Sequence, residues 1–246
     1  AIGGTGALAV NVRLLRRMAP DAKLVLPVPA WGNYRPLFAD PGLEVIEVPH
    51  VTDGRASIDG ILMALETESA PLAVILQTSC HNPTGLDLSP ERWAGLAAAM
   101  AARGATAILD TAYQGFADAP EEELVGLRAM READVPVLLA WSASKNHSLY
   151  AQRVGLAVAL TPDAAAKELA ERHYGRIARS IHSASAAFGQ LVVARTQQKH
   201  AAAWRKDLEG ARAILRRKRE ALVAGVPAFA RELSGNGMFA LLPVSK

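Results

Sequence analysis

The sequence predicts an α/β fold in which helices flank a mostly parallel sheet. Short apolar runs recur along the chain, and stretches with helical spacing separate them. This alternation is typical of parallel sheets whose two faces are both covered by helices. With 246 residues and 50% hydrophobic content, the chain is long enough for one large domain, or for one domain and part of another.

Six apolar runs are the expected strands, at residues Lys23–Val28, 43–48, Leu72–Gln77, 106–110, 135–141 and 154–160. Covering helices are expected at 5–18 and 89–103, and Ser89, Pro90 and Glu91 form the N-cap and first turn of the second. After residue 183 the strand pattern gives way to a long helix at about 188–224, which a break can interrupt. Polar groups that follow strand ends are where we expect chemistry.

The long helix has one apolar and one basic face. The apolar face carries Trp204, Leu208, Ala211, Leu215 and Leu222, and the basic face carries Arg205, Lys206, Arg212, Arg216, Arg217 and Arg219. No aromatic side chains alternate with these basic residues to stack on bases, so we interpret the basic face as solvated.

Composition excludes several classes of protein. The chain has 27 Lys and Arg against 24 Asp and Glu, a net charge of +3 that does not indicate a nucleic-acid partner. Cys80 is the single cysteine, so no internal disulfide can form and a reducing compartment is expected. The sequence shows neither a secretory signal nor a membrane span. We therefore expect a cytoplasmic protein.

The two ends are unusual. The chain begins without Met inside a Gly-rich turn and stops shortly after Leu241 and Leu242 without a closing helix. We expect both ends to be cuts through a larger fold, and the isolated chain to be inactive.

Three polar segments follow the predicted strands. In the first, WSASKN at 141–146, Lys145 comes after two small hydroxyl residues. Taken alone, a surface lysine explains this segment better than a Schiff-base lysine does. In the second, Asp110 ends an apolar strand and Tyr113 follows three residues later. A buried carboxylate there needs a cationic partner, although an N-cap Asp with a core Tyr is an equal alternative.

The third segment is the turn HNPTG at 81–85, in which Asn82 can donate a hydrogen bond and Asn82-Pro83 is a candidate cis bond. As a bare turn it carries little information. The order of the three segments, with Lys145 lying 35 residues after Asp110, makes a chance coincidence improbable.

Together these segments resemble the aspartate and aromatic amino acid aminotransferases, which are class I aminotransferases and pyridoxal-phosphate (PLP)-dependent enzymes of fold type I. The resemblance runs from Gly3 to about Phe239. It implies the fold-type I architecture of PLP-dependent transferases, with a large PLP-binding domain at residues 1–212 that lacks its N-terminal part. It also implies part of a smaller C-terminal α/β domain at residues 213–246.

The resemblance assigns a role to each polar residue. Lys145 would form the Schiff base with the cofactor and act as the catalytic base, and Asp110 would pair with the pyridine nitrogen. Tyr113 and Asn82 would hold the phenolic oxygen. Catalytic roles are thus implied for Lys145, Asp110 and Tyr113.

The cofactor's phosphate would bind at the other end of the site. Arg153, in YAQRVG at 150–155, matches the family's phosphate-binding arginine, and Ser142 would add a hydroxyl. Gly4 and Thr5, in the turn GGTGA at 3–7, would offer backbone N–H groups at a helix N-terminus. On its own this Gly-rich turn is a weak signal, and a plain tight turn explains it better.

Substrate contacts are implied by looser matches. Trp31 would stack on the cofactor ring and border the substrate together with Asn82, and Asn33 would lie near the substrate's α-carboxylate. Arg179 aligns with an arginine that reaches into the neighbouring subunit's site and binds a side-chain carboxylate, which implies a homodimer. A core Trp31 and a surface Arg179 remain alternatives.

The sequence also departs from the family. Tyr34 stands where family members commonly have a histidine behind the pyridine-binding aspartate. The family's arginine for the substrate α-carboxylate would lie beyond Lys246.

The implied activity is transamination between an amino acid, aspartate or aromatic or both, and a 2-oxo acid, with 2-oxoglutarate expected. A PLP-dependent lyase or decarboxylase would share every cofactor residue, so this alternative stays open, as does an inactive fragment. A nucleotide-binding domain is disfavoured, because the first strand is not followed by a Gly-x-Gly-x-x-Gly turn.

Overall fold

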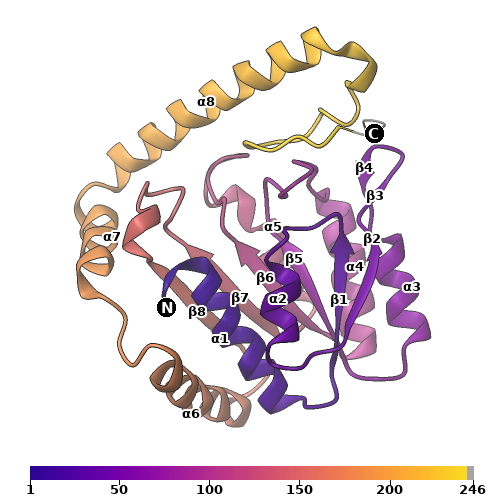
Figure 1. The fold of residues 1–246 in the computed structure, drawn as a ribbon, viewed down its shortest axis with the longest axis vertical. Coiled ribbons are helices and arrows are strands. Elements are labelled where there is room, and N and C mark those ends of the chain that lie inside the picture. Colours follow the sequence, from indigo (N-terminus) through magenta and orange to yellow (C-terminus); the bar gives the residue numbers. More distant parts are fainter. Residues whose placement is uncertain (243–246) are drawn as a thin grey trace.

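The computed structural model describes residues 1–242 and has a six-stranded sheet at its centre (Figure 1). The strands are β1 (Lys23–Val28), β2 (Val45–Pro49), β5 (Leu72–Gln77), β6 (Thr106–Thr111), β7 (Val137–Ser142) and β8 (Gly155–Leu160), in the order β2-β1-β5-β6-β7-β8. Neighbouring strands are parallel except β7 and β8, which are antiparallel. The predicted α/β fold is confirmed, and each predicted strand is present.

Helices cover both faces of this sheet (Figure 1). One face packs against α1 (Gly3–Met18), α2 (Tyr34–Ala39) and α6 (Ala164–Ile181), and the other against α3 (Asp59–Thr67), α4 (Pro90–Arg103) and α5 (Val125–Glu132). The remaining short elements are the ribbon of β3 (Val51–Thr52) and β4 (Arg55–Ala56) and the 3₁₀ turns η1 (Glu122–Leu124), η2 (Tyr150–Gln152) and η3 (Pro227–Phe229).

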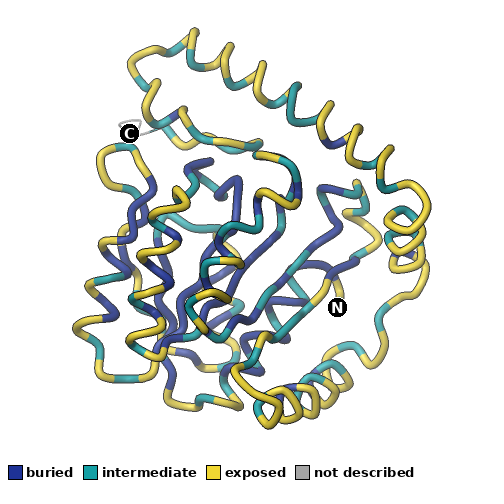
Figure 2. The backbone as a smooth tube through the Cα atoms, turned by 180° about the vertical axis from the view of Figure 1, so that it is seen from behind, coloured by how far each residue is buried: buried dark blue, intermediate teal, exposed yellow. Residues whose placement is uncertain are grey.

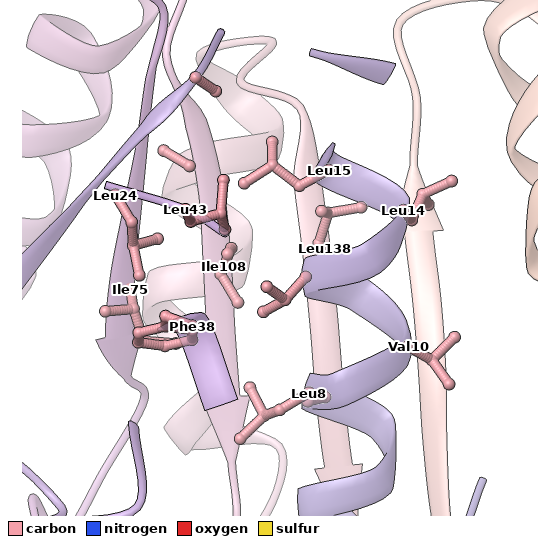
Figure 3. Packing of buried hydrophobic residues seen from close by; sticks show 14 of the residues in the cluster. Leu8, Val10, Leu14, Leu15, Leu24, Phe38, Leu43, Ile75, Ile108 and Leu138 are labelled. Atoms are coloured by element: carbon pink, nitrogen blue, oxygen red, sulfur yellow. The ribbon is translucent and has the colours of Figure 1, made fainter. Parts of the chain in front are cut away.

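Alternate residues of each central strand enter different cores. In β5, Ile75 faces the α1 side whereas Val74 and Leu76 face the α4 side. Figure 3 shows Ile75 and Ile108 opposite Leu8 of α1. Because both faces are covered, the central strands β1, β5, β6 and β7 are mostly buried (Figure 2), which is why they occur in the sequence as continuous apolar runs. The edge strands β2 and β8 are only partly buried.

The α4 helix begins as its sequence predicts. The Ser89 side chain accepts a hydrogen bond from the Arg92 backbone N–H at 3.3 Å, and Pro90 occupies the first helical position. Gly104 ends the helix in the left-handed conformation, with φ +68°.

The predicted long helix consists of two helices, α7 (Ala187–Lys199) and α8 (Ala201–Gly225), which meet at His200, where φ is −134°. The predicted domain boundary between residues 212 and 213 falls inside α8. No helix within residues 1–242 combines the length and apolarity needed to cross a bilayer.

The prediction of a fully solvated basic face on α8 is wrong for two arginines. Arg212 donates hydrogen bonds to the backbone oxygens of Gly115 and Asp118, at 2.9 and 3.0 Å. Arg219 donates to the backbone oxygens of Asn236, Gly237 and Phe239. Arg212 follows the buried Leu208 by one helical turn, so it lies on the side of α8 that packs against the loops.

Candidate active site

The carboxyl ends of the parallel strands meet at one edge of the sheet, where they border an open cleft. The cleft is lined by Gly4, Thr5, Leu8, Trp31, Gln77, Asn82, Asp110, Ala112, Tyr113, Ser142, Ser144, Lys145, Tyr150 and Arg153. Every residue that sequence analysis predicts to bind the cofactor is therefore in this lining. Trp31, after β1, and Lys145, after β7, are more than a hundred positions apart in the chain and meet here because both strands end at the same edge of one sheet.

Asp110 lies near the end of β6 and is buried. The Tyr34 hydroxyl donates a hydrogen bond to its Oδ2 at 2.7 Å, whereas Oδ1 has no partner among the described residues. Burial raises the pKa of Asp110 to about 6, and the Tyr34 hydrogen bond and the Lys145 charge hold it lower than burial alone would. A buried oxygen without a partner calls for a donor from the cleft.

Lys145 follows β7 and extends toward Asp110 and Tyr113. Burial lowers the pKa of Lys145, the Asp110 charge opposes this, and the Arg153 charge adds to it. The ammonium Nζ lies 5.1 Å from the centre of the Tyr113 ring. A lysine with a lowered pKa is more often a neutral amine, the form that acts as nucleophile and base.

Tyr113 receives a long hydrogen bond from Asn82 Nδ2, at 3.4 Å. Gln77 in turn fixes Asn82, because its side chain accepts from the Asn82 N–H at 2.8 Å and donates to the Asn82 carbonyl at 3.0 Å. The Asn82-Pro83 bond is cis, as the turn motif suggests. These residues form a fixed polar wall of the cleft.

The N-terminus of α1 closes the opposite end of the cleft. Gly3 has φ +64°, and a Cβ there would lie 2.7 Å from Arg153 Nη2. A Cβ on Gly4 would lie 3.0 Å from the Ser142 Cβ. The glycines thus let the free N–H groups of the helix approach Arg153 and Ser142 closely. Helix dipole, N–H groups, guanidinium and hydroxyl together suit a dianion.

These groups fit pyridoxal phosphate as the cofactor. The unpartnered Asp110 oxygen suits a protonated pyridine nitrogen, Tyr113 and Asn82 suit a phenolic oxygen, and the α1 cradle suits a phosphate. Lys145 lies between them as the amine. Within residues 1–242, no group of three His, Cys, Asp or Glu side chains could hold a metal ion.

Sequence analysis missed three polar residues of the cleft lining. Ser144 lies 3.5 Å from Arg153 Nη1, and the Ser-x-Ser-Lys spacing could have signalled its role. Gln77 could have been noted as a polar residue at the end of β5. Tyr150 places its ring 5.2 Å from Lys145 Nζ and 5.6 Å from the Arg153 guanidinium carbon. Nothing in the sequence distinguishes it from any other loop tyrosine.

The predicted substrate residues divide into two groups. Trp31 lines the cleft, and its ring meets Tyr34 edge-on, with centroids 5.3 Å apart. Asn33 and Arg179 are exposed and lie outside the cleft lining, and Arg179 donates to Ser183 Oγ at 3.1 Å. Their substrate roles stay predictions.

Comparison with known proteins agrees with this geometry. Residues 1–246 match the family model for aminotransferase class I and II. The chain is 34% identical to the aromatic-amino-acid aminotransferase of Paracoccus denitrificans over 97% of its length, and 32% identical to the aspartate aminotransferase of Pseudomonas aeruginosa over 91%. It spans 60% and 57% of these two relatives.

Solved structures show the same fold. An aromatic amino acid aminotransferase with 3-indolepropionic acid superposes with a TM-score of 0.94 and 32% identity, over 100% of this chain and 66% of that one. The Burkholderia pseudomallei aromatic-amino-acid aminotransferase, described as covalently bound to pyridoxal phosphate, gives a TM-score of 0.89 and 33% identity, over 97% and 62%. The central sheet, the helices on both its faces and the match along the full sequence lead to one assignment: the chain belongs to the class I and II aminotransferases.

Proposed function

We propose that this chain carries the active site of a pyridoxal-phosphate-dependent aminotransferase, which moves an amino group from an amino acid to a 2-oxo acid. One observation supports this above all. The Lys145 amine, the unpartnered oxygen of Asp110 and the dianion cradle at α1 line a single cleft. If Lys145 were only a surface lysine and Asp110 only a helix cap, nothing would require them to lie in the same cleft as the dianion cradle.

Each residue has a distinct task. Gly4, Thr5, Ser142 and Arg153 hold the phosphate, which leaves the rest of the cofactor to be aligned by Asp110 and Tyr113. The cofactor, when bound, supplies an electron sink for the electron pair left at the substrate Cα. Asp110, as a carboxylate, keeps the pyridine nitrogen protonated, a state on which that sink depends.

Lys145 would hold the cofactor covalently and, once the substrate amine has displaced it, would serve as the base in its free amine form. Its lowered pKa means that a larger fraction of Nζ is neutral at pH 7 than in a solvated lysine. A neutral Nζ can accept the proton from the substrate Cα, and the resulting ammonium can return it elsewhere on the conjugated system. Asp110 and Tyr113, which lie nearby, keep the ammonium form accessible.

The substrates we propose are an aspartate-type or aromatic amino acid and 2-oxoglutarate. Relatives named for aromatic amino acids, tyrosine and aspartate are all similar to this chain, so the choice among these substrates is open. Trp31, at the cleft, would contact the substrate together with Asn82, and Asn33 would lie near the α-carboxylate. We assign Arg179 to the side-chain carboxylate of a dicarboxylic substrate bound in a second subunit.

A homodimer is part of this proposal. Phe188 and Leu191 of α7 are 69% and 67% exposed, and Tyr150, which borders the cleft, is 65% exposed. Gly189, between the two α7 residues, packs against Gln152 and Val154, so these apolar groups lie on one side of the molecule close to the cleft. An apolar surface of this kind suits a second copy. We place the protein in the cytoplasm, since Cys80 is a buried free thiol.

Covalent trapping tests the proposal. We expect borohydride reduction of the protein with pyridoxal phosphate to leave a pyridoxyl group on Lys145, located by peptide mass mapping, and Lys145→Ala to abolish it. Amino acid turnover that depends on an added 2-oxo acid would separate an aminotransferase from a lyase or decarboxylase. An adduct on another lysine, or turnover without a 2-oxo acid, would contradict the assignment.

A further inference from the structure

The turn that carries Lys145 is held from outside the sheet by α7 and α8. Trp204, in the first turns of α8, donates its indole N–H to the backbone oxygen of Asn146 at 2.7 Å. Asn146 immediately follows Lys145 in the chain. The indole therefore binds the carbonyl group of the residue that follows the reactive lysine.

His147 strengthens the same contact. Its ring stacks on Trp204, with centroids 4.8 Å apart and planes 26° apart, and meets the Trp141 ring edge-on at 5.7 Å. Its Nδ1 lies 2.9 Å from Asn146 Oδ1, and its Nε2 lies 2.9 Å from Gln197 Nε2 of α7. Burial lowers the pKa of His147 to about 4, so the ring is neutral at pH 7. A neutral ring protonated at Nδ1 satisfies both contacts.

The other side of the turn is fixed by the sheet. The Ala143 N–H donates to the Val154 oxygen at 3.1 Å, and the Ser148 N–H donates to the Lys145 oxygen at 3.0 Å. Lys145 thus lies between a backbone group held by the strand pair β7 and β8 and one held by Trp204. Without the indole bond, the far end of this segment would keep only the contacts that the His147 ring makes with Gln197, Trp204 and Trp141.

We propose that Trp204 is a positioning residue that sets where the Lys145 amine stands in the cleft, through its hydrogen bond to Asn146 and its stack on His147. This inference rests on the proposed function, in which Lys145 is the reacting amine. The dianion cradle lies on α1 and Arg153, which Trp204 does not contact, so cofactor affinity is expected to be independent of Trp204. Small displacements of a reacting group cost rate more than affinity.

The test separates the rate of covalent attachment from cofactor affinity. Trp204→Phe keeps an aromatic ring for His147 but removes the indole donor. In the full natural protein, we expect the rate at which pyridoxal phosphate attaches to Lys145, followed by absorbance and borohydride trapping, to fall about tenfold. The affinity for pyridoxamine phosphate, which cannot attach to Lys145, should stay within about twofold. The melting temperature should change little.

Two further variants sharpen the test. Gln197→Ala, at an exposed position of α7, should slow attachment in the same direction but less, because it removes only the support of His147. Ile214→Ala, an exposed position of α8 outside these contacts, should have no effect. If Trp204→Phe attaches the cofactor at the normal rate, or loses rate and pyridoxamine phosphate affinity together, Trp204 does not position Lys145. If the unmodified protein forms no adduct at Lys145, the proposed function itself fails.

Discussion

Asp110 and Tyr34 form a buried hydrogen-bonded pair, and only one of the two Asp110 carboxylate oxygens takes part in it. Tyr34 donates to Oδ2, whereas Oδ1 has no partner within residues 1–242. A phenol is neutral through the whole physiological range, and burial raises the pKa of Tyr34 further. Tyr34 therefore stabilises the charge on Asp110 by donation alone, whereas the histidine common in the family could also carry a proton.

The buried charge of Asp110 lowers the unfolding free energy of the cofactor-free protein, and this predicts how its stability depends on pH. The pKa of Asp110 is raised to about 6 from an ordinary value of 3.8, so the native state binds this proton more tightly than the unfolded state. The penalty is absent below pH 4, grows as pH rises toward 6, and is complete above it, at roughly 3 kcal/mol. Asp110→Asn should therefore stabilise the cofactor-free protein above pH 6 and leave it unchanged near pH 4.

Urea unfolding of both proteins at several pH values between 4 and 8 measures this difference. The same variant should lose transamination, because an amide cannot hold a pyridine nitrogen in its protonated form. An equal difference in unfolding free energy at every pH would show that Asp110 does not become charged in the fold over this range.

Individual site residues could be predicted from sequence only where a local pattern marked them. Lys145 and Asn82 each follow an apolar strand and Asp110 lies at the end of one, so the rule that functional residues gather at strand ends locates them. Trp204 and Gln197 come from a helix pair whose docking on the Lys145 turn has no sequence signal. Tyr34 was marked as a departure, but its bond to Asp110 is a contact between residues 76 positions apart.

At the scale of elements, the N-terminus of α1 is shaped by the residues that it must approach. Gly3 has a left-handed backbone conformation, and a Cβ atom added to it would lie 2.7 Å from Nη2 of the Arg153 guanidinium. Gly42 has a similar backbone, with φ +76°, but open space around its Cβ direction. Alanine at Gly42 would therefore cause backbone strain alone, whereas alanine at Gly3 would cause backbone strain and also crowd Arg153.

We expect Gly3→Ala to weaken binding of pyridoxal phosphate by about tenfold, because Arg153 must move away from the helix N-terminus. Both Gly3→Ala and Gly42→Ala should lose about 1 to 2 kcal/mol of unfolding free energy from the left-handed backbone. Cofactor titration and urea unfolding of the two variants measure these quantities separately. Equal cofactor affinity in both would show that α1 and Arg153 do not form the phosphate site.

Elements with a strong local signal were predictable, and those defined by tertiary contacts were not. The α4 helix was located by Ser89 and Pro90, and β5 by its uninterrupted apolar run. The antiparallel direction of β8 is invisible in its sequence, since its short apolar run is compatible with either direction and its pairing with β7 alone sets the direction. The helical spacing of the sequence placed Arg212 on the solvated face of α8. Its partners are backbone oxygens of a loop distant in sequence, which the spacing does not reveal.

At the scale of the whole molecule, one chain brings the proposed cofactor-binding residues together in one cleft but does not bring every proposed substrate residue to it. Arg179 lies exposed on α6, outside the cleft lining. It can take part in substrate binding only if a second copy presents it. In that arrangement each site combines Lys145 of one subunit with Arg179 of the other.

Mixing two defective variants tests this arrangement directly. Lys145→Ala removes the reacting amine, and Arg179→Ala should raise KM for aspartate and glutamate while sparing an aromatic substrate. If Arg179 acts across the interface, a mixed dimer contains one intact site and one site with both defects. Random reassociation of equal amounts of the two variants should then restore about a quarter of the wild-type kcat/KM for aspartate, since about half of the dimers are mixed. An arginine acting within its own subunit leaves no intact site, so the mixture would show only the average of its two parents. The aromatic substrate is the control. Arg179→Ala alone should keep its activity with this substrate, so mixing the two variants should give no gain over the average of the parents.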